Sequence, residues 1–112
     1  MRENILKAQI EEYLFVKHLF YLRLNSGDIV KGYGKSRRRI RLCPEGTADF
    51  IVIQTVKSCT ISQLKVIWIE AKGEGTEWTE EQKLFALDVV DRGMSYYVVE
   101  TVEQVQNIFE RG

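Results

Sequence analysis

The sequence is poor in the residues on which disulfide-rich and zinc-thiolate proteins depend. It has two cysteines, Cys43 and Cys59, which are too few for a disulfide framework and lack the spacing of a thiolate zinc site. We therefore expect reduced thiols and a cytosolic location. The single histidine, His18, has no second histidine or matching cysteine to complete a zinc site, so we interpret it as a surface residue.

The chain also lacks a long apolar run and a net charge. No hydrophobic stretch approaches the roughly 20 residues that cross a bilayer, and the charged N-terminal stretch does not resemble a cleaved signal. We expect no membrane partner. Sixteen acidic residues balance sixteen basic ones, so no global field draws the protein onto nucleic acid. Any such contact must come from a local patch.

The residues that are present fit one small folded domain. The 112 residues are 45% hydrophobic and 29% charged, with one proline, which is a globular composition. A chain of this length holds one core but not two. We therefore treat residues 1–112 as a single domain with one site.

Periodicity and turn residues predict alternating helices and strands. The predicted elements are a helix from Glu3 to about Phe20, strands at Phe20 to Leu24, Asp49 to Gln54, Lys65 to Lys72 and Ser95 to Glu100, and helices opened by the capping boxes Thr79-x-x-Gln82 and Thr101-x-x-Gln104. Gly93 suits the left-handed end of the second helix. This order predicts an α/β fold in which helices flank a mixed β-sheet, with the last strand parallel to its neighbour.

The two long apolar strands can form a hairpin through the polar segment 55–64, and both read as central strands covered on both faces. That hairpin places Asp49 across from Glu70. Because alternate residues of a strand share a face, Lys72 projects to the same side as Glu70. Two carboxylates and an ammonium group are therefore predicted to converge.

This combination favours a hard divalent cation. Two carboxylates at close range repel each other and are costly to bury unless a cation lies between them. Mg²⁺ or Mn²⁺ suits oxygen ligands, lowers the pKa of a bound water and neutralises charge on a phosphate, while a neighbouring lysine stabilises the transition state. These parts suffice for phosphodiester hydrolysis.

The same residues carry a family resemblance. Gly46-Thr47-Ala48-Asp49 followed by Glu70-Ala71-Lys72 resembles the D…E-x-K signature of the restriction-endonuclease-like superfamily, and is most similar to its virus-type replication-repair nuclease (VRR-NUC) family. The resemblance covers essentially the whole chain and implies a restriction-endonuclease-like core. Ala48 departs from it, because many superfamily members have proline before the aspartate.

The resemblance implies roles for individual residues. Asp49, Glu70 and the Ala71 carbonyl would be metal ligands, and Lys72 the catalytic lysine. Glu3 and Gln82 would be supporting groups around the metal and its water. It further implies a structure-selective DNA endonuclease acting as a homodimer on branched DNA such as a four-way junction, in the manner of Holliday-junction resolvases. The alternatives are a nucleic-acid-binding or assembly module with little cleavage activity, and a nuclease for flaps or single strands.

One strongly basic tract lies between Lys31 and Arg41 and follows a turn cluster at Asn25 to Asp28. Its basic side chains, interrupted by glycines and Tyr33, suit phosphate and sugar contacts. The predicted DNA-binding residues are Ser26, Lys31, Lys35, Arg37, Arg38 and Arg39. The alternative is a solvated hairpin edge that discourages aggregation.

Simpler interpretations stay open for the site residues. Glu70 and Lys72 also fit an ordinary charge pair at a strand end, and Asp49 fits a turn. An acidic residue at Glu3 is favoured by the helix dipole alone, and Glu11 or Glu12 could replace it at the site. Gln82 has a complete explanation as the capping partner of Thr79.

Overall fold

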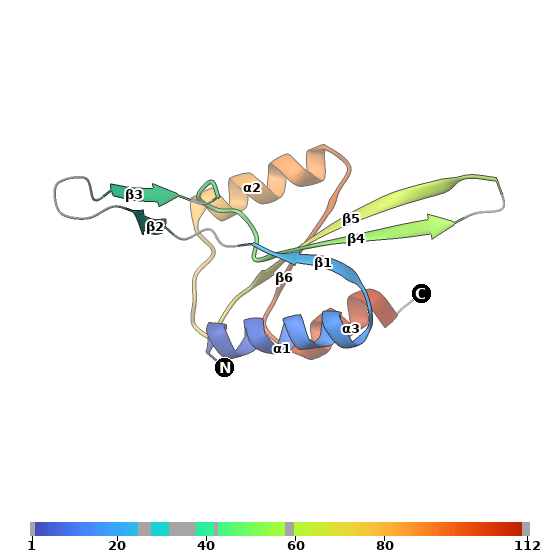
Figure 1. Cartoon of the computed structure of the whole chain (residues 1–112), viewed down its shortest axis with the longest axis horizontal. Coiled ribbons are helices and arrows are strands. Elements are labelled where there is room, and N and C mark those ends of the chain that lie inside the picture. Colours follow the sequence, from blue (N-terminus) through green and yellow to red (C-terminus); the bar gives the residue numbers. More distant parts are fainter. Residues whose placement is uncertain (1, 25–27, 32–37, 42, 58–59, 111–112) are drawn as a thin grey trace.

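The computed structural model describes residues 2–24, 28–31, 38–41, 43–57 and 60–110, with the backbone alone for 28–31 and 38–41. In chain order the elements are α1 (Glu3–Val16), β1 (Phe20–Arg23), β2 (Asp28–Lys31), β3 (Arg38–Arg41), β4 (Phe50–Lys57), β5 (Ser62–Ala71), α2 (Glu80–Asp91), β6 (Ser95–Val99) and α3 (Val102–Glu110). The main sheet has the order β1-β4-β5-β6 and is mixed, because only β6 is parallel to its neighbour. The predicted α/β fold with a mixed sheet and flanking helices is confirmed (Figure 1).

The helices cover the sheet unequally. Figure 1 shows α1 and α3 on one face and α2 on the other. The core lies under α1 and α3, where Leu6, Ile10 and Leu14 of α1 pack with the inward side chains of β4 and β5, among them Phe50 and Ile69. Because strand residues alternate between faces, the residues between these core positions must face α2.

The β4–β5 hairpin has the predicted register. Phe50 lies opposite Ile69, which brings Asp49 to the end of the ladder beside Glu70. The predicted connection at 55–64 is wrong, however, because β4 continues to Lys57 and β5 begins at Ser62. The far half of both strands is exposed, and in the near half of β4 Ile51 and Ile53 are only half-buried, so the prediction that both faces are covered is right only in part.

Helix α1 ends earlier than predicted. The periodicity suggested an end near Phe20, but the helix stops at Val16. His18 adopts a left-handed conformation with φ of 58°, and the amide of Leu19 donates to the Leu14 carbonyl at 3.1 Å. This pattern is a Schellman ending, which satisfies the last carbonyls and turns the chain into β1. The side chain of His18 is exposed, as predicted.

The ends of α2 and the start of α3 follow the sequence signals. Thr79 and Gln82 form the predicted capping box, and Gly93 ends α2 with φ of 88°. Thr101 accepts from the Gln104 amide at the start of α3. These local signals set the helix boundaries without help from distant contacts.

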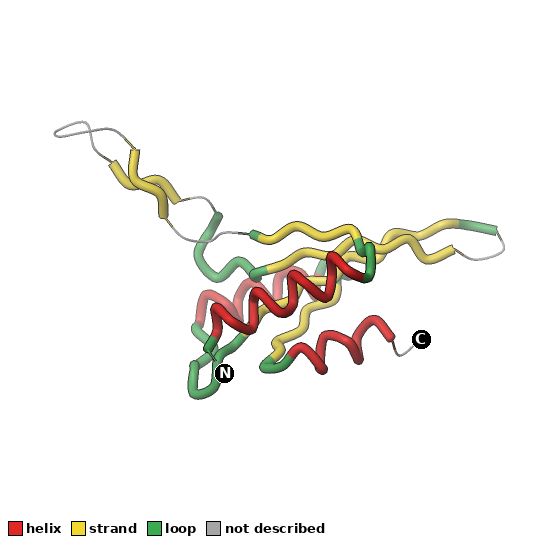
Figure 2. The backbone as a smooth tube through the Cα atoms, turned by 60° about the horizontal axis from the view of Figure 1, so that its bottom comes forward, coloured by secondary structure: helices red, strands yellow, loops and turns green. Residues whose placement is uncertain are grey.

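Strand β1 pairs with β4, and a separate two-stranded sheet holds β2 and β3. The turn predicted at Asn25 to Asp28 is only partly described: Asp28 begins β2, and residues 25–27 lie outside the described residues. Figure 2 shows the β2–β3 pair reaching away from the main sheet. The backbone of this pair thus stands apart from the main sheet as an appendage.

Two further observations concern the whole described chain. Cys43 is a free thiol, and Cys59 lies outside the described residues. Within the part of the chain that the structure describes, no helix has the length and apolar character needed to span a bilayer.

Candidate metal centre

Asp49 and Glu70 meet at the end of the β4–β5 ladder. Asp49 immediately precedes β4, and Glu70 is the penultimate residue of β5. The Ala71 amide donates to Asp49 Oδ2 at 2.8 Å, which fixes the aspartate across from the β5 terminus. Both carboxylates are buried, with 8% and 3% of their surface exposed. The predicted juxtaposition is confirmed, and Asp49 is not a solvated turn residue.

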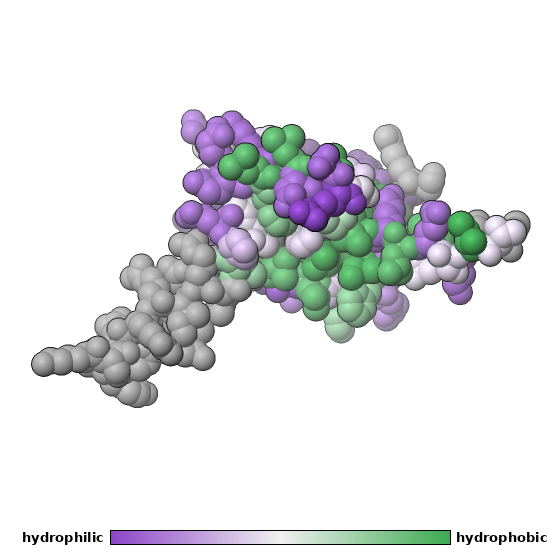
Figure 3. All heavy atoms as spheres, turned by 90° about the horizontal axis from the view of Figure 1, so that it is seen from above, coloured by the Kyte–Doolittle hydropathy of each residue, from purple (hydrophilic) through white to green (hydrophobic). Residues whose placement is uncertain are grey.

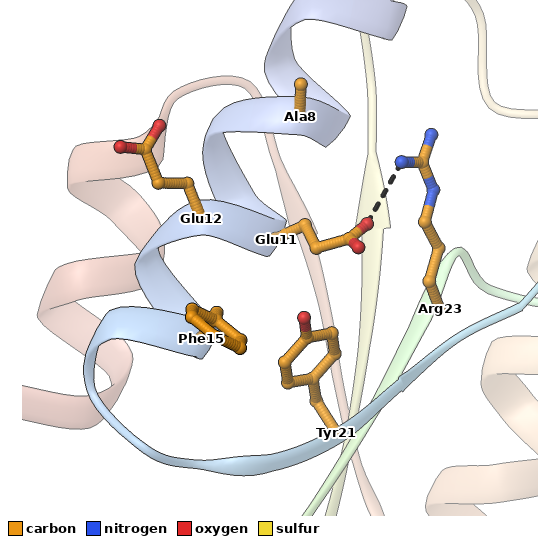
Figure 4. A pocket seen from close by; sticks show the side chains of 6 residues that line it. All are labelled: Ala8, Glu11, Glu12, Phe15, Tyr21 and Arg23. Carbon is orange, nitrogen blue, oxygen red and sulfur yellow. Dashed lines mark hydrogen bonds and ion pairs between the residues drawn. The ribbon is translucent and has the colours of Figure 1, made fainter.

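Glu3 completes a cluster of three carboxylates. It lies in the first turn of α1, and one oxygen each from Glu3, Asp49 and Glu70 lies within 4.8 Å of the others. The substitutes considered for Glu3 do not reach the site. Figure 4 shows Glu11 and Glu12 further along α1, where Glu11 pairs with Arg23 of β1 at 3.0 Å. Among the candidate helix carboxylates, the structure therefore selects Glu3.

Lys72 follows β5 directly and is 5% exposed. Its Nζ donates to the Glu77 carbonyl at 3.1 Å, which holds the ammonium group by the loop that leads to α2. Burial raises the pKa of Glu70 and is the larger effect. The positive charge of Lys72 favours the ionised carboxylate and therefore lowers this pKa in part. Glu70 and Lys72 are thus a buried pair and not a surface charge pair.

Lys7 is a site residue that the sequence analysis missed. Its Nζ lies 3.1 Å from Asp49 Oδ1, so both oxygens of Asp49 have a partner. The available signal was its position: Lys7 stands four residues after Glu3, and residues at that spacing share one face of a helix. Helix α1 therefore brings an acid and a base to the site from successive turns.

Gln82 serves the helix and the site with one side chain. Its Oε1 accepts from the Thr79 amide at 2.9 Å, completing the capping box, while its Nε2 donates to Glu70 Oε1 at 2.8 Å. The sequence analysis posed these as alternatives, but an amide offers both an acceptor and a donor. Gln82 therefore orients Glu70 from the first turn of α2.

Gly46 allows α2 to approach the site. Its φ is 88°, and a Cβ placed there would overlap the Glu81 carbonyl oxygen and lie 2.5 Å from its carbon and 3.0 Å from the Gln82 nitrogen. Only glycine adopts this conformation without strain and leaves room for the helix backbone. The glycine of the Gly-x-x-Asp segment is therefore explained by packing against the turn that carries Gln82.

Burial, with the neighbouring negative charge of Asp49, raises the pKa of Glu70 from 4.5 to about 8. Its Oε2 is buried and, among the described residues, has no hydrogen-bond partner. A carboxylate that lacks a partner for one oxygen, beside two further carboxylates, fits an oxygen-liganded divalent cation. The donor set would be Asp49, Glu70 and Glu3, with the Ala71 carbonyl adjacent.

Because the pKa of Glu70 is higher in the folded protein than in the unfolded chain, the free energy of unfolding depends on pH. Between about 4.5 and about 8 the folded protein binds one more proton at Glu70 than the unfolded chain, so the free energy of unfolding falls as the pH rises through this range. We expect Glu70→Gln, which keeps an acceptor for Gln82, to raise the melting temperature at pH 9 and to leave it nearly unchanged at pH 4. At pH 9 the gain should be on the order of 2 kcal/mol or more.

The matched control is Glu81→Gln, which removes an exposed glutamate in the first turn of α2. Thermal unfolding followed by circular dichroism, without divalent ions, should show a weaker pH dependence for the Glu70 variant and an unaltered one for the Glu81 variant. Equal pH dependence in the wild type and both variants would contradict the assignment.

The predicted DNA-binding residues are placed only in part. Lys31 pairs with Arg38 and Val30 with Arg39 in the β2–β3 ladder, where the backbone alone is described. Ser26, Lys35 and Arg37 lie outside the described residues. Lys31, Arg38 and Arg39 therefore belong to the β2–β3 pair, and the contact of the basic tract with DNA stays a prediction.

Comparison with known proteins gives no identification. No family model matches the chain, and neither a curated protein nor a solved structure matches it. The resemblance to VRR-NUC nucleases therefore stays a prediction from the sequence, and the function must be argued from the site.

Proposed function

We propose that this chain is a nuclease that hydrolyses phosphodiester bonds in DNA with Mg²⁺ or Mn²⁺. The observation that carries the proposal is the convergence of three carboxylates, from Glu3, Asp49 and Glu70. One of them, Glu70, has a buried oxygen with no hydrogen-bond partner among the described residues. Such a cluster repels itself and is stabilised by a divalent cation. Lys72 is buried and lies two residues after Glu70. It adds the positive charge that phosphoryl chemistry requires.

Each residue has a role that its contacts support. Asp49, Glu70 and the Ala71 carbonyl would hold the cation, with Glu3 completing the ligand set directly or through water. When bound, the cation would acidify a water and offset charge on the phosphate. Lys72 would stabilise the charge that develops on the phosphate oxygens, and Gln82 would keep Glu70 oriented through its 2.8 Å hydrogen bond. Lys7 must release Asp49 Oδ1 if that oxygen is to bind a cation.

Branched DNA is the substrate that the family resemblance favours. The basic residues of β2 and β3 support it, because a pair of strands that reaches away from the main sheet is suited to contact phosphates away from the scissile bond. A four-way junction is the first substrate to test, with flaps and single strands as the other candidates.

A second function is favoured by one observation. The Lys7–Asp49 ion pair neutralises a site carboxylate without any metal. That arrangement suits a nucleic-acid-binding or assembly module that keeps the fold and does not cleave. Direct measurement of metal binding separates the two functions, because the module has no need of a cation at Asp49.

The test of the proposal is cleavage of labelled four-way junctions, flaps, single strands and linear duplexes at one salt concentration, with Mg²⁺, Mn²⁺ or EDTA. We expect cleavage only with the divalent ions, the junction being cut first, and none by Asp49→Asn. Calorimetry with Mn²⁺ provides the binding readout. Failure of the wild type to cut any substrate or to bind Mn²⁺, with junction binding retained, would replace the nuclease by the binding module.

A further inference from the structure

Lys7 holds the oxygen of Asp49 for which a divalent cation would compete. The Ala71 amide donates to Asp49 Oδ2 at 2.8 Å, which ties that oxygen to the backbone at the end of β5. The other oxygen, Oδ1, lies 3.1 Å from the Lys7 ammonium. Because like charges repel strongly at this range, the ammonium and a divalent cation compete for Oδ1. A metal-loaded site therefore requires Lys7 to leave Asp49.

The two lysines of the site are held differently. Lys72 is 5% exposed, and its ammonium donates to the Glu77 carbonyl at 3.1 Å, so a backbone group fixes its position. The side chain of Lys7 is 24% exposed, and its ammonium is held by the carboxylate of Asp49. An ammonium on a flexible four-carbon stem that reaches solvent can change partners without rearrangement of the backbone. Lys7 is therefore the lysine that a cation at Asp49 displaces.

The charges of the site favour such an exchange. The three carboxylates of the cluster face two ammonium groups, those of Lys7 and Lys72. Burial raises the pKa of Glu70 and is the larger effect, while both lysines lower it in part, so Lys7 acts on Glu70 as well as on Asp49. A divalent cation carries twice the charge of the ammonium that it replaces. The cluster is therefore better compensated after the exchange, and Lys7 becomes available to another anion.

A hollow of about 490 Å³ adjoins the site at Glu3. It is lined by Arg2, Glu3, Gly73, Glu74 and Thr76. Figure 1 shows the loop after β5 passing beside the first turn of α1 before it rises to α2. In Figure 3, seen from the α2 side, hydrophilic side chains gather at the end of the molecule where α2 begins. Since Glu3 and Lys7 share one face of α1, a phosphate that enters this polar hollow beside the carboxylates lies within reach of the Lys7 side chain.

We propose that Lys7 is a displaceable cation that couples metal binding to the binding of a substrate phosphate. In the metal-free protein Lys7 pairs with Asp49. When Asp49 Oδ1 is taken by a divalent cation, Lys7 pairs instead with a phosphate of the DNA strand in the hollow beside Glu3. DNA then raises the affinity for the metal, and the metal raises the affinity for DNA by the same factor. This inference rests on the metal centre of the proposed nuclease.

The first test is calorimetry of the full chain with Mn²⁺ and without DNA. Lys7→Met removes the competing ammonium and keeps the apolar stem, so we expect it to bind Mn²⁺ roughly 10- to 100-fold more tightly than the wild type. Lys7→Arg keeps the positive charge and should bind Mn²⁺ no more tightly than the wild type. Circular dichroism checks that both variants fold, and Mn²⁺ should raise the melting temperature of Lys7→Met by more than that of the wild type.

Lys17→Met is the matched control. It removes a lysine at the opposite end of α1, where the ammonium pairs with Glu110 at 3.2 Å. The net charge changes equally, but the site keeps its competitor, so the affinity for Mn²⁺ should equal that of the wild type. Asp49→Asn introduced into Lys7→Met should abolish the gain in affinity, which locates the competition at Asp49.

The second test measures the phosphate contact. The affinity for Ca²⁺, which takes the same oxygen ligands, is compared with and without a four-way junction. The junction should raise the affinity of the wild type and of Lys17→Met by roughly tenfold more than that of Lys7→Met, because Lys7→Met has no ammonium to transfer to a phosphate. This comparison within the wild type needs no variant to fold.

The outcomes separate this inference from the proposed nuclease. Wild-type binding of Mn²⁺ with an unchanged affinity in Lys7→Met overturns the role of Lys7 and leaves the nuclease standing. A wild type whose affinity for Ca²⁺ ignores the junction, or an equal effect of the junction on Lys7→Met, overturns it as well. Failure of both proteins to bind Mn²⁺ overturns the role of Lys7 together with the metal centre. Tighter Mn²⁺ binding by Lys7→Met and coupling to the junction, without cleavage of any substrate, would support Lys7 and oppose the nuclease.

Discussion

Replacement of Lys72 by methionine is expected to reduce single-turnover cleavage by roughly 10²- to 10³-fold, the cost of removing one preorganised electrostatic group. Methionine keeps the length and apolar stem of the side chain but loses the ammonium that donates to the Glu77 carbonyl and lies near Glu70. The loss should fall on the chemical step, so the affinity for DNA measured with Ca²⁺ should change little. Calorimetry should show Mn²⁺ binding that is at most modestly altered.

The control is Lys65→Met, which removes an exposed lysine from β5, the strand that leads to Lys72. It alters the net charge equally but lies away from the carboxylates, so its cleavage rate should match that of the wild type. Equal losses in both variants would assign the effect to non-specific attraction of DNA. A Lys72 variant that cleaves at the wild-type rate would remove Lys72 from the catalytic machinery.

Gly46→Ala is expected to destabilise the protein strongly. The left-handed φ of 88° costs on the order of 1–2 kcal/mol for a residue with a Cβ. The new Cβ also overlaps the Glu81 carbonyl, so α2 must move and Gln82 must lose its contact with Glu70. We expect a total loss of about 3 kcal/mol or more and a fall of at least about 10 °C in melting temperature.

Gly93→Ala isolates the first contribution, the cost of the left-handed backbone conformation. Gly93 has the same φ of 88° at the other end of α2, but an added Cβ there meets nothing within 4 Å. Its loss should therefore be limited to the cost of the backbone conformation. Thermal unfolding of both variants, with Mn²⁺ binding measured at a temperature where each is folded, checks the comparison. Similar losses in the two variants, with Mn²⁺ binding intact, would show that the close approach at Gly46 has no consequence.

The parts of the fold that rest on local signals were predictable. The capping boxes at Thr79 and Thr101 and the glycine end at Gly93 act within one turn of the helix that they delimit. The β4–β5 register followed from two apolar runs joined by a short polar segment. The extension of β4 through 55–57 and of β5 back to 62–64 was not predictable from hydrophobicity, because these residues are exposed. Nor did periodicity reveal the end of α1, since a histidine occupies the left-handed position usually held by glycine.

The candidate site was predictable where two residues share a strand or a hairpin. Glu70, Lys72 and Asp49 belong to this group, and their placement depends only on alternation and register. Glu3 and Lys7 are different, because their approach to Asp49 depends on how α1 docks against the sheet. That docking is set by the whole core, and the sequence of α1 alone offers Glu11 and Glu12 equally. The fold alone does not determine which metal binds, which substrate is used or which family the chain belongs to.

The double use of the Gln82 side chain ties the site to the first turn of α2. Helix ends are the parts of a protein that open most often, through local unfolding at low free-energy cost. Here the amide that closes the capping box also holds Glu70, so fraying of this helix end and release of the carboxylate are one event. The opening of the first turn of α2 therefore governs how long Glu70 keeps its orientation. Hydrogen exchange of the backbone amides in this turn reports on whether Glu70 is held by Gln82.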